Sequence, residues 1–186
     1  MARRFLILHG IENRRPPEHW HRWLAERLRN QGEQVIYPQL PQPDAPRFAD
    51  WDELLSAELE MLGDGERIVV CHSLGCTLWL RAAPQPAVDR VLLVAPPSRR
   101  MVVRLAPSFA ARRVDPAAAV AAAGHTTFVC SDSDPYNPEG EAPGLAEAMS
   151  ARVHVVPGGG HLSSDDGYGP WPALEAWCLD PTSATF

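Results

Sequence analysis

The sequence has no long hydrophobic run, no excess of basic residues and no closely paired cysteines. The apolar run at residues 5–8 is far shorter than the roughly 20 residues that span a bilayer, so we expect no membrane span. Arg3 and Arg4 precede this run, but no cleavage site of small residues follows it. We therefore expect no secretory signal and predict a cytoplasmic protein.

The charge balance is acidic, with 17 Lys+Arg against 23 Asp+Glu and a formal net charge of −6. Proteins that bind the phosphate backbone normally carry a basic excess, so we expect no nucleic-acid partner. The cysteines form no CxxC pair and have no clustered histidines around them, which predicts neither a zinc site nor a disulfide framework. We expect reduced, mostly buried thiols at all four positions: Cys71, Cys76, Cys130 and Cys178.

Short apolar runs alternate with longer amphipathic stretches along the 186 residues. This alternation predicts a single α/β domain over residues 1–186, with a doubly wound, mainly parallel sheet covered by helices on both faces. The strands are expected at residues 4–9, 34–37, 67–71, 90–95, 126–131 and 152–156, and the helices at residues 18–30, 51–62, 74–83, 142–150 and 170–179. Asp50, with Glu53 three residues later, is expected to cap the second helix.

The segment 96–124 is less regular and long enough to fold over the carboxyl edge of the sheet. A solvated face is the favoured interpretation of its arginines, and recruitment of an anion is the alternative. These arginines are Arg99, Arg100, Arg104, Arg112 and Arg113. Elsewhere, the six tryptophans are expected to pack between helices and sheet, and His19, His21, His125 and His154 are expected at surface or boundary positions.

Reactive groups in a parallel sheet gather in the loops after the strands' carboxyl ends. One expected strand runs directly into CHSLGC at residues 71–76 and then into a helix, with Ser73 at the apex of the turn. A nucleophilic serine must project from such a tight turn, which requires small residues two positions away on both sides. Gly75 meets this requirement downstream, and Cys71 replaces the usual glycine upstream. The alternative is that Ser73 only caps the helix.

Two further loops bring a carboxylate and an imidazole to the same edge. SDSDPY at residues 131–136 and GGGH at residues 158–161 each follow an expected strand. A serine needs an imidazole to take its proton, and the imidazole needs a carboxylate to orient it, so Ser73, Asp134 and His161 are the candidate catalytic residues. Asp132 is the rival carboxylate, but Pro135 stiffens the turn after Asp134. We interpret Asp165 and Asp166 as exposed loop charges and His72 as a structural histidine.

Acyl transfer also needs donors for the oxyanion of the tetrahedral intermediate. The expected donors are the backbone N–H of Leu74, after the nucleophile, and that of Gly10 or Ile11 in the loop after the first strand.

These motifs, with His9-Gly10 after the first strand, resemble those of the α/β-hydrolase superfamily. The short chain, His19-Trp20 and GYGPWP at residues 167–172 resemble the small serine hydrolase family that includes retinoblastoma-binding protein 9. This resemblance implies a minimal α/β-hydrolase fold without a large lid domain, with Ser73 as nucleophile, Asp134 as orienting acid and His161 as general base. Cys71 departs from the usual elbow sequence.

We therefore expect an esterase-like serine hydrolase that cleaves small carboxylic esters through a covalent acyl-enzyme, without a metal or organic cofactor. Its expected partner is a small-molecule ester or a related acyl compound. One alternative is a catalytically silent α/β-hydrolase that acts as a protein-binding module, although the sequence does not point to a protein partner. Another is a cysteine nucleophile, Cys71 or Cys76.

Overall fold

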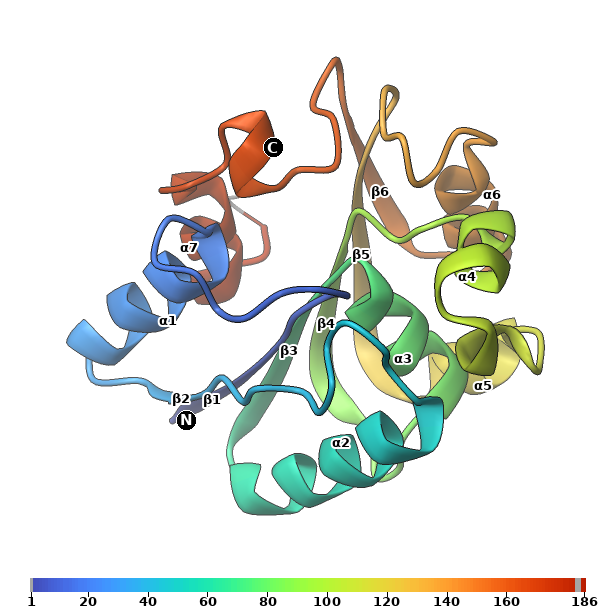
Figure 1. Cartoon of the computed structure of the whole chain (residues 1–186). Helices are drawn as coiled ribbons and strands as arrows, with labels where there is room; N and C mark the ends of the chain where they lie inside the picture. Colours follow the sequence, from blue (N-terminus) through green and yellow to red (C-terminus); the bar gives the residue numbers. More distant parts are fainter. Residues whose placement is uncertain (1, 183–184) are drawn as a thin grey trace.

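The six strands of the sheet all run parallel, in the order β2-β1-β3-β4-β5-β6. The computed structural model describes residues 2–182 and 185–186 (Figure 1). The strands are β1 (Arg3–Leu8), β2 (Gln34–Ile36), β3 (Glu66–His72), β4 (Val88–Val94), β5 (Ala123–Ser131) and β6 (Arg152–Val156). The predicted parallel sheet is confirmed. Its strands are apolar on both faces, so both faces must be covered by helices to be removed from water.

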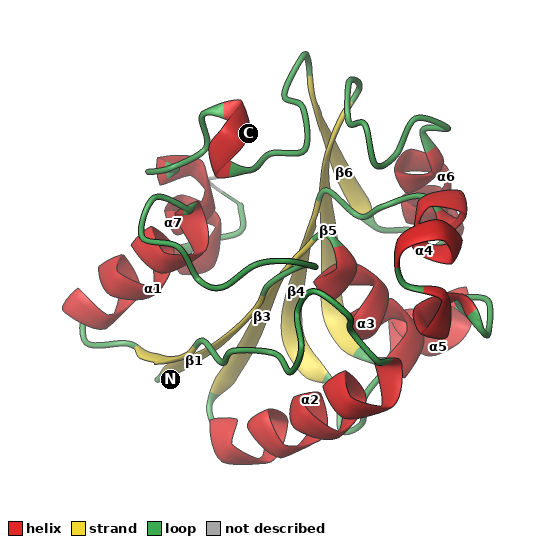
Figure 2. Ribbon diagram, in the orientation of Figure 1, coloured by secondary structure: helices red, strands yellow, loops and turns green. Residues whose placement is uncertain are grey.

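Helices cover the two faces of this sheet (Figures 1 and 2). One face packs against α1 (Trp20–Asn30) and α7 (Pro172–Leu179), and the other against α2 (Phe48–Leu62), α3 (Leu74–Ala82), α4 (Arg99–Leu105), α5 (Pro116–Ala121) and α6 (Glu141–Ala148). Two short 3₁₀ helices, η1 (Pro107–Ala110) and η2 (Ser164–Asp166), lie in the connecting segments. No described helix is long and apolar enough to cross a membrane.

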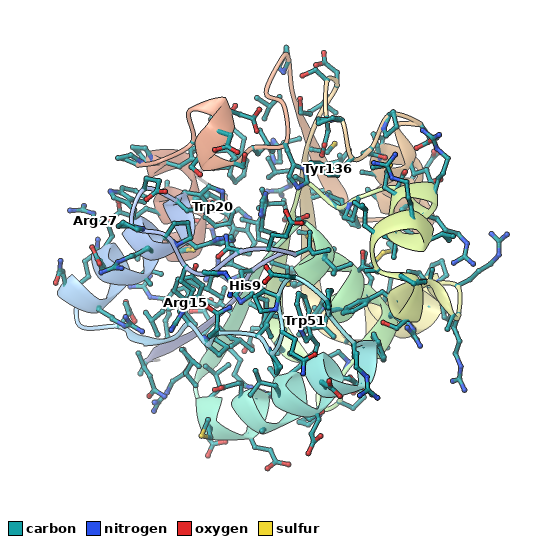
Figure 3. All side chains as sticks on the ribbon, in the orientation of Figure 1. His9, Arg15, Trp20, Arg27, Trp51 and Tyr136 are labelled. Carbon is teal, nitrogen blue, oxygen red and sulfur yellow. The ribbon has the colours of Figure 1, made fainter. Side chains whose placement is uncertain are left out.

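The core consists of two apolar layers, one on each face. Side chains of a strand alternate between faces, so Phe5 and Ile7 of β1 enter one layer while Leu6 and Leu8 enter the other. Trp20 of α1 fills the first layer and Trp51 of α2 the second (Figure 3), and both indoles are fully buried. The tryptophans therefore serve packing, as expected.

Two expectations about local structure are wrong. Helix α2 begins at Phe48, with Arg47 rather than Asp50 at its N-cap, so Asp50 lies within the first turn. The irregular segment 96–124 contains α4, η1 and α5. Helix α5 has two strong start signals, since the Asp115 carboxylate accepts from two N–H groups of the first turn and Pro116 occupies the first helical position.

The edge strand β6 is less well covered than the central strands. Val153 and Val155 are 37% and 47% exposed. They lie two residues apart and therefore on the same face of the strand. An edge strand has a neighbouring strand on only one side, which leaves its side chains more exposed than those of a central strand.

The order of the strands reverses between β1 and β3. After β1 the chain adds β2 on one side and then crosses to add β3, β4, β5 and β6 on the other. At such a switch point the connections leave in opposite directions and open a crevice outside the carboxyl ends of the strands. The loops after β1, β3, β5 and β6 all leave the sheet at this end (Figure 2). In the sequence these loops contain Gly10, Ser73, Asp134 and His161.

Candidate active site

Ser73 occupies a strained turn between β3 and α3. Its backbone has φ 53° and ψ −124°, in a region that residues with a side chain rarely adopt. The Ser73 N–H donates to the carbonyl of Val94 at 2.9 Å, which ties the turn to β4. Gly75 allows the close packing, because a Cβ there would lie 2.8 Å from the carbonyl oxygens of Leu8 and His9. The buried Cys71 belongs to β3 and pairs with Leu8, so the upstream position accommodates a thiol.

Three side chains that the sequence brings from distant loops form one chain of hydrogen bonds. The Ser73 Oγ lies 2.9 Å from His161 Nε2, and His161 Nδ1 lies 3.0 Å from both carboxylate oxygens of Asp134. A carboxylate accepts but does not donate, so Nδ1 carries the proton and Nε2 faces the serine hydroxyl with its lone pair. Asp134 is only 3% exposed and also accepts from the N–H of Tyr136 at 2.8 Å.

The other acidic residues near His161 hold the backbone of the loops. Asp132 accepts from the N–H of Gly158 at 2.7 Å, so the rival carboxylate links its own loop to the glycine run and does not contact the His161 ring. Asp166 accepts from the N–H of His161 at 2.9 Å and, as expected, is exposed. Gly160 has φ 59°, and a Cβ there would lie 2.1 Å from Oδ1 of Asp166. The glycine run therefore lets this carboxylate hold the His161 backbone.

His72 and Tyr136 contact His161, and neither contact was expected. The Nε2 of His72 lies 3.0 Å from the carbonyl oxygen of His161, an acceptor only, so His72 donates. The ring of Tyr136, labelled in Figure 3, lies 4.4 Å from that of His161 between centroids. Both residues belong to the motifs that single out Ser73 and Asp134, but a motif does not give the direction of a neighbouring side chain.

The expectation that His19 and His21 lie at the surface is wrong. They are 4% and 0% exposed, and their rings stack at 4.1 Å beside that of His72. Burial lowers the pKa of His19 to about 4 and those of His21 and His72 well below their usual range. His19 is the N-cap of α1, and Trp20 and His21 are its first residues; all three are buried, so this end of the helix faces inward.

These three histidines are the one candidate cluster of metal ligands among the described residues. Their ligand atoms lie within 4.8 Å of one another, whereas two nitrogens on one zinc ion lie about 3.3 Å apart. The rings of His19 and His21 are also nearly parallel, at 7°, so their in-plane lone pairs do not converge on a common point. The donor set does not fit a preformed metal site.

The loop after β1 presents a free backbone donor to the site. His9 Nε2 accepts from the N–H of Leu40 at 2.9 Å, so its Nδ1 carries the proton and donates to the carbonyl of Gly10 at 2.7 Å. In a planar trans peptide the next N–H points the opposite way, which directs the Ile11 N–H away from the His9 ring. Within the described chain, neither the Ile11 nor the Leu74 N–H has an acceptor.

The four cysteines are free and buried, as predicted. Burial raises the pKa of Cys71 and Cys76 well above the usual value for a thiol. The Sγ of Cys76 donates to the carbonyl of Val94 at 3.2 Å. A buried thiol that remains protonated is a poor nucleophile, so the structure favours the Ser73 hydroxyl over both thiols as the attacking group.

Ser73 opens onto two hollows of different character. A cleft of about 520 Å³ carries four carboxylates on its walls, and no arginine or lysine among the described residues lines it. These carboxylates belong to Glu12, Glu18, Asp165 and Asp166. The other hollow holds only about 20 Å³ and is walled mainly by apolar side chains, including Leu74, Met101 and Leu105. Ile11 and Tyr136 line both hollows.

Comparison with known proteins gives a family match and several structural relatives. The model of the family described as serine hydrolase matches residues 5–178. YdeN of Bacillus subtilis (strain 168), a hydrolase by name, is 27% identical over 179 residues, covering 94% of this chain and 93% of YdeN. The crystal structure of the ydeN gene product has a TM-score of 0.83 and covers 98% of this chain and 100% of that one.

More distant structures share the fold. Est1E from Butyrivibrio proteoclasticus, solved with ferulic acid bound, has a TM-score of 0.72 at 12% identity, covering 98% of this chain and 90% of Est1E. The monoacylglycerol lipase of Paleococcus ferrophilus has a TM-score of 0.64 at 15% identity, covering 94% of this chain and 93% of the lipase. These likenesses support the α/β-hydrolase fold, and residues 2–182 and 185–186 form no large additional domain.

Proposed function

The chain belongs to the serine hydrolase family, and we propose that it hydrolyses small carboxylic esters through an acyl-enzyme on Ser73. The observation that carries this proposal is the continuous hydrogen-bonded chain from Ser73 through His161 to Asp134. The motifs further suggest a place in the group of small hydrolases that includes retinoblastoma-binding protein 9, which is part of the same proposal.

In the proposed mechanism, His161 Nε2 takes the proton of Ser73 as its Oγ attacks the ester carbonyl carbon. The carbonyl oxygen becomes an oxyanion, which accepts from the Leu74 and Ile11 N–H groups. The tetrahedral intermediate then collapses: its bond to the alcohol oxygen breaks, and His161 returns the proton to that oxygen. A water molecule, deprotonated by His161, then attacks the acyl carbon. The bond from that carbon to Ser73 Oγ breaks, His161 returns the proton to Oγ, and the carboxylic acid leaves. Asp134 stabilises the imidazolium of His161 in both halves of the cycle.

We propose the Ile11 N–H rather than the Gly10 N–H as the second oxyanion donor, and the His9 hydrogen bond supports this choice. That bond engages the Gly10 carbonyl and so sets the direction of the next N–H. Because His9 is fully buried and its pKa is lowered by burial to about 4, its ring is neutral and keeps this arrangement at neutral pH.

The two hollows suggest the substrate class. The hollow beside Leu74 and Met101 is little larger than one water molecule, so it fits an acyl group as short as acetyl. The larger cleft takes the alcohol part, and its acidic walls favour alcohols that are uncharged or cationic.

Turnover of an activated acetyl ester such as p-nitrophenyl acetate tests this proposal. We expect Ser73→Ala and His161→Gln to abolish measurable turnover, and Asp134→Asn to lower kcat about 10⁴-fold, as loss of the orienting acid does in other serine hydrolases. Asp132→Asn is the matched control, because that carboxylate holds the backbone of Gly158 and does not contact the His161 ring. Turnover by folded Ser73→Ala at the wild-type rate would contradict the proposal.

A further inference from the structure

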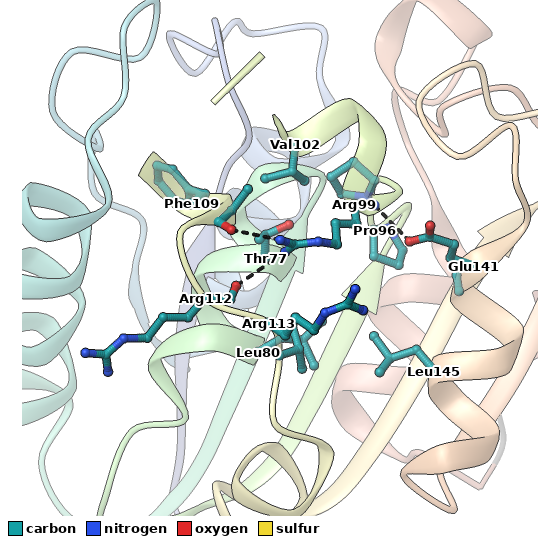
Figure 4. A pocket seen from close by; sticks show the side chains of 14 residues that line it. Thr77, Leu80, Pro96, Arg99, Val102, Phe109, Arg112, Arg113, Glu141 and Leu145 are labelled. Carbon is teal, nitrogen blue, oxygen red and sulfur yellow. Dashed lines mark hydrogen bonds between the residues drawn. The ribbon is translucent and has the colours of Figure 1, made fainter. Parts of the chain in front are cut away.

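A second cavity, of about 240 Å³, lies on the α3 side of the sheet (Figure 4). Ser73, Asp134 and His161 are all absent from its lining. Its walls are largely aliphatic or aromatic and include Leu80, Val102, Phe109 and Leu145. Pockets for drug-sized ligands measure about 300–1,000 Å³, so this cavity is sized for a smaller compound.

The mouth of this cavity carries an excess of positive charge in a protein whose net charge is −6. The guanidinium of Arg99 donates to the carbonyls of Ala110 at 3.1 Å and Arg112 at 3.5 Å, which fixes its charge at this place. The carboxylate of Glu141 accepts from the backbone N–H of Arg99 at 2.8 Å (Figure 4). The Glu141 carboxylate therefore already accepts a hydrogen bond, and main-chain carbonyls fix the position of the Arg99 guanidinium.

The exposed side chains of Arg112 and Arg113 both lack a hydrogen-bond or ion-pair partner among the described residues. The one that lies over the cavity is Arg113 (Figure 4). The guanidinium of the neighbouring Arg112 points away from the cavity in the same view. Because Arg113 is exposed, water screens its charge in the free protein, and an anion bound over the cavity is attracted by both Arg99 and Arg113.

We propose that this cavity binds a small amphipathic carboxylate. The aliphatic part of the ligand packs against Leu80, Val102 and Leu145, and its carboxylate binds the guanidinium of Arg113. A guanidinium presents a planar fork of donors that matches the two oxygens of a carboxylate. The apolar walls select a ligand with a hydrocarbon part over inorganic anions, because burying that part removes apolar surface from water. This site does not depend on Ser73.

Calorimetric titration with hexanoate tests the site, and Arg112 provides a matched control. We expect saturable binding that Arg113→Gln weakens about tenfold, the effect of losing one hydrogen bond between charged groups. Arg112→Gln should leave the affinity unchanged, since it removes the same charge one residue away. Hexanamide, which has the same chain without the charge, should bind about tenfold more weakly than hexanoate.

Two further titrations separate this cavity from the cleft at Ser73. Leu145→Phe, which fills the cavity without changing charge, should abolish hexanoate binding, and Ser73→Ala should not alter it. The proposal is overturned if hexanoate shows no saturable binding, or if Arg112→Gln and Arg113→Gln weaken it equally. It is also overturned if Arg113→Gln has no effect. All of these outcomes are independent of whether the protein hydrolyses esters.

Discussion

His72 donates a hydrogen bond of 3.0 Å to the main-chain carbonyl of His161, so the residue before Ser73 holds the loop of the proposed base. The two rings lie 4.9 Å apart between centroids. His72 is 4% exposed, and its pKa lies well below the usual range, chiefly because of burial. It therefore stays neutral at neutral pH and acts as a positioning residue.

We expect His72→Phe, which cannot donate, to lower kcat about tenfold or more while changing KM much less. The reason is that a freed carbonyl lets the His161 ring drift from Ser73, and loss of alignment affects the transition state more than binding. His72→Gln, whose amide can donate, should recover part of the loss. Steady-state kinetics on both folded variants check this, and equal activity of His72→Phe and wild type would refute the positioning role.

The small hollow beside Ser73 predicts a preference for short acyl chains. For p-nitrophenyl esters we expect kcat/KM to fall from acetate to hexanoate, because longer chains leave apolar surface in water that the hollow of about 20 Å³ cannot cover. Met101→Ala should enlarge the hollow and shift the optimum to longer chains. For each methylene that the enlarged hollow can bury, kcat/KM should rise about fourfold. If kcat/KM of the wild-type protein instead increased with the length of the acyl chain, the acyl group would bind elsewhere.

The acidic cleft predicts discrimination by the charge of the alcohol part. We expect the methyl ester of para-acetoxybenzoate to be cleaved about tenfold faster than para-acetoxybenzoate itself, since four carboxylates line the cleft. The double substitution of Glu12→Gln and Glu18→Gln should reduce the difference between the two cleavage rates. Added salt should also reduce it, because salt screens exposed charges. Equal rates for the two compounds at low salt would contradict this assignment of the cleft.

Four buried histidines predict a loss of stability in mild acid. Burial lowers the pKa of His9 and His19 to about 4, and those of His21 and His72 well below the usual value. The unfolded chain binds these protons near pH 6.5 and the folded protein does not, so unfolding takes up protons below that pH. The free energy of unfolding should thus fall from pH 7 towards pH 4, by at most about 5 kcal/mol per pH unit.

Urea unfolding at several pH values measures this slope. His21→Phe removes a ring whose two buried nitrogens have no hydrogen-bond partner among the described residues, and should reduce the slope by about 1.4 kcal/mol per pH unit. His125→Asn is the control, because it removes a histidine whose side chain is exposed. A slope that His21→Phe does not alter would mean that this ring is protonated in the folded protein.

The sheet could be predicted from the sequence because strand length and apolar character depend on local composition. The β6 range, for example, agrees with the predicted residues 152–156. The boundaries of α2 and the helices of segment 96–124 could not be predicted. Asp50 and the arginines of that segment are compatible with several local structures, and tertiary packing selects one of them. The Asp115-Pro116 pair was the one local signal of α5 in that segment.

At the site, order and spacing along the chain select Ser73, Asp134 and His161, and the structure brings their side chains together. What the sequence does not give is the direction in which each side chain points. The inward turn of His19 and His21, the bond from His72 to the His161 carbonyl and the use of Asp132 as a backbone acceptor all depend on how loops from different strands meet.

The central claim is that Ser73 is the nucleophile, and reaction with a fluorophosphonate followed by peptide mass mapping tests it most directly. We predict one adduct per chain, on Ser73, which is absent in Ser73→Ala and retained in Cys71→Ala and Cys76→Ala. Folded protein that stays unlabelled under conditions that label a reference serine hydrolase, or that carries its adduct on another residue, would contradict the claim.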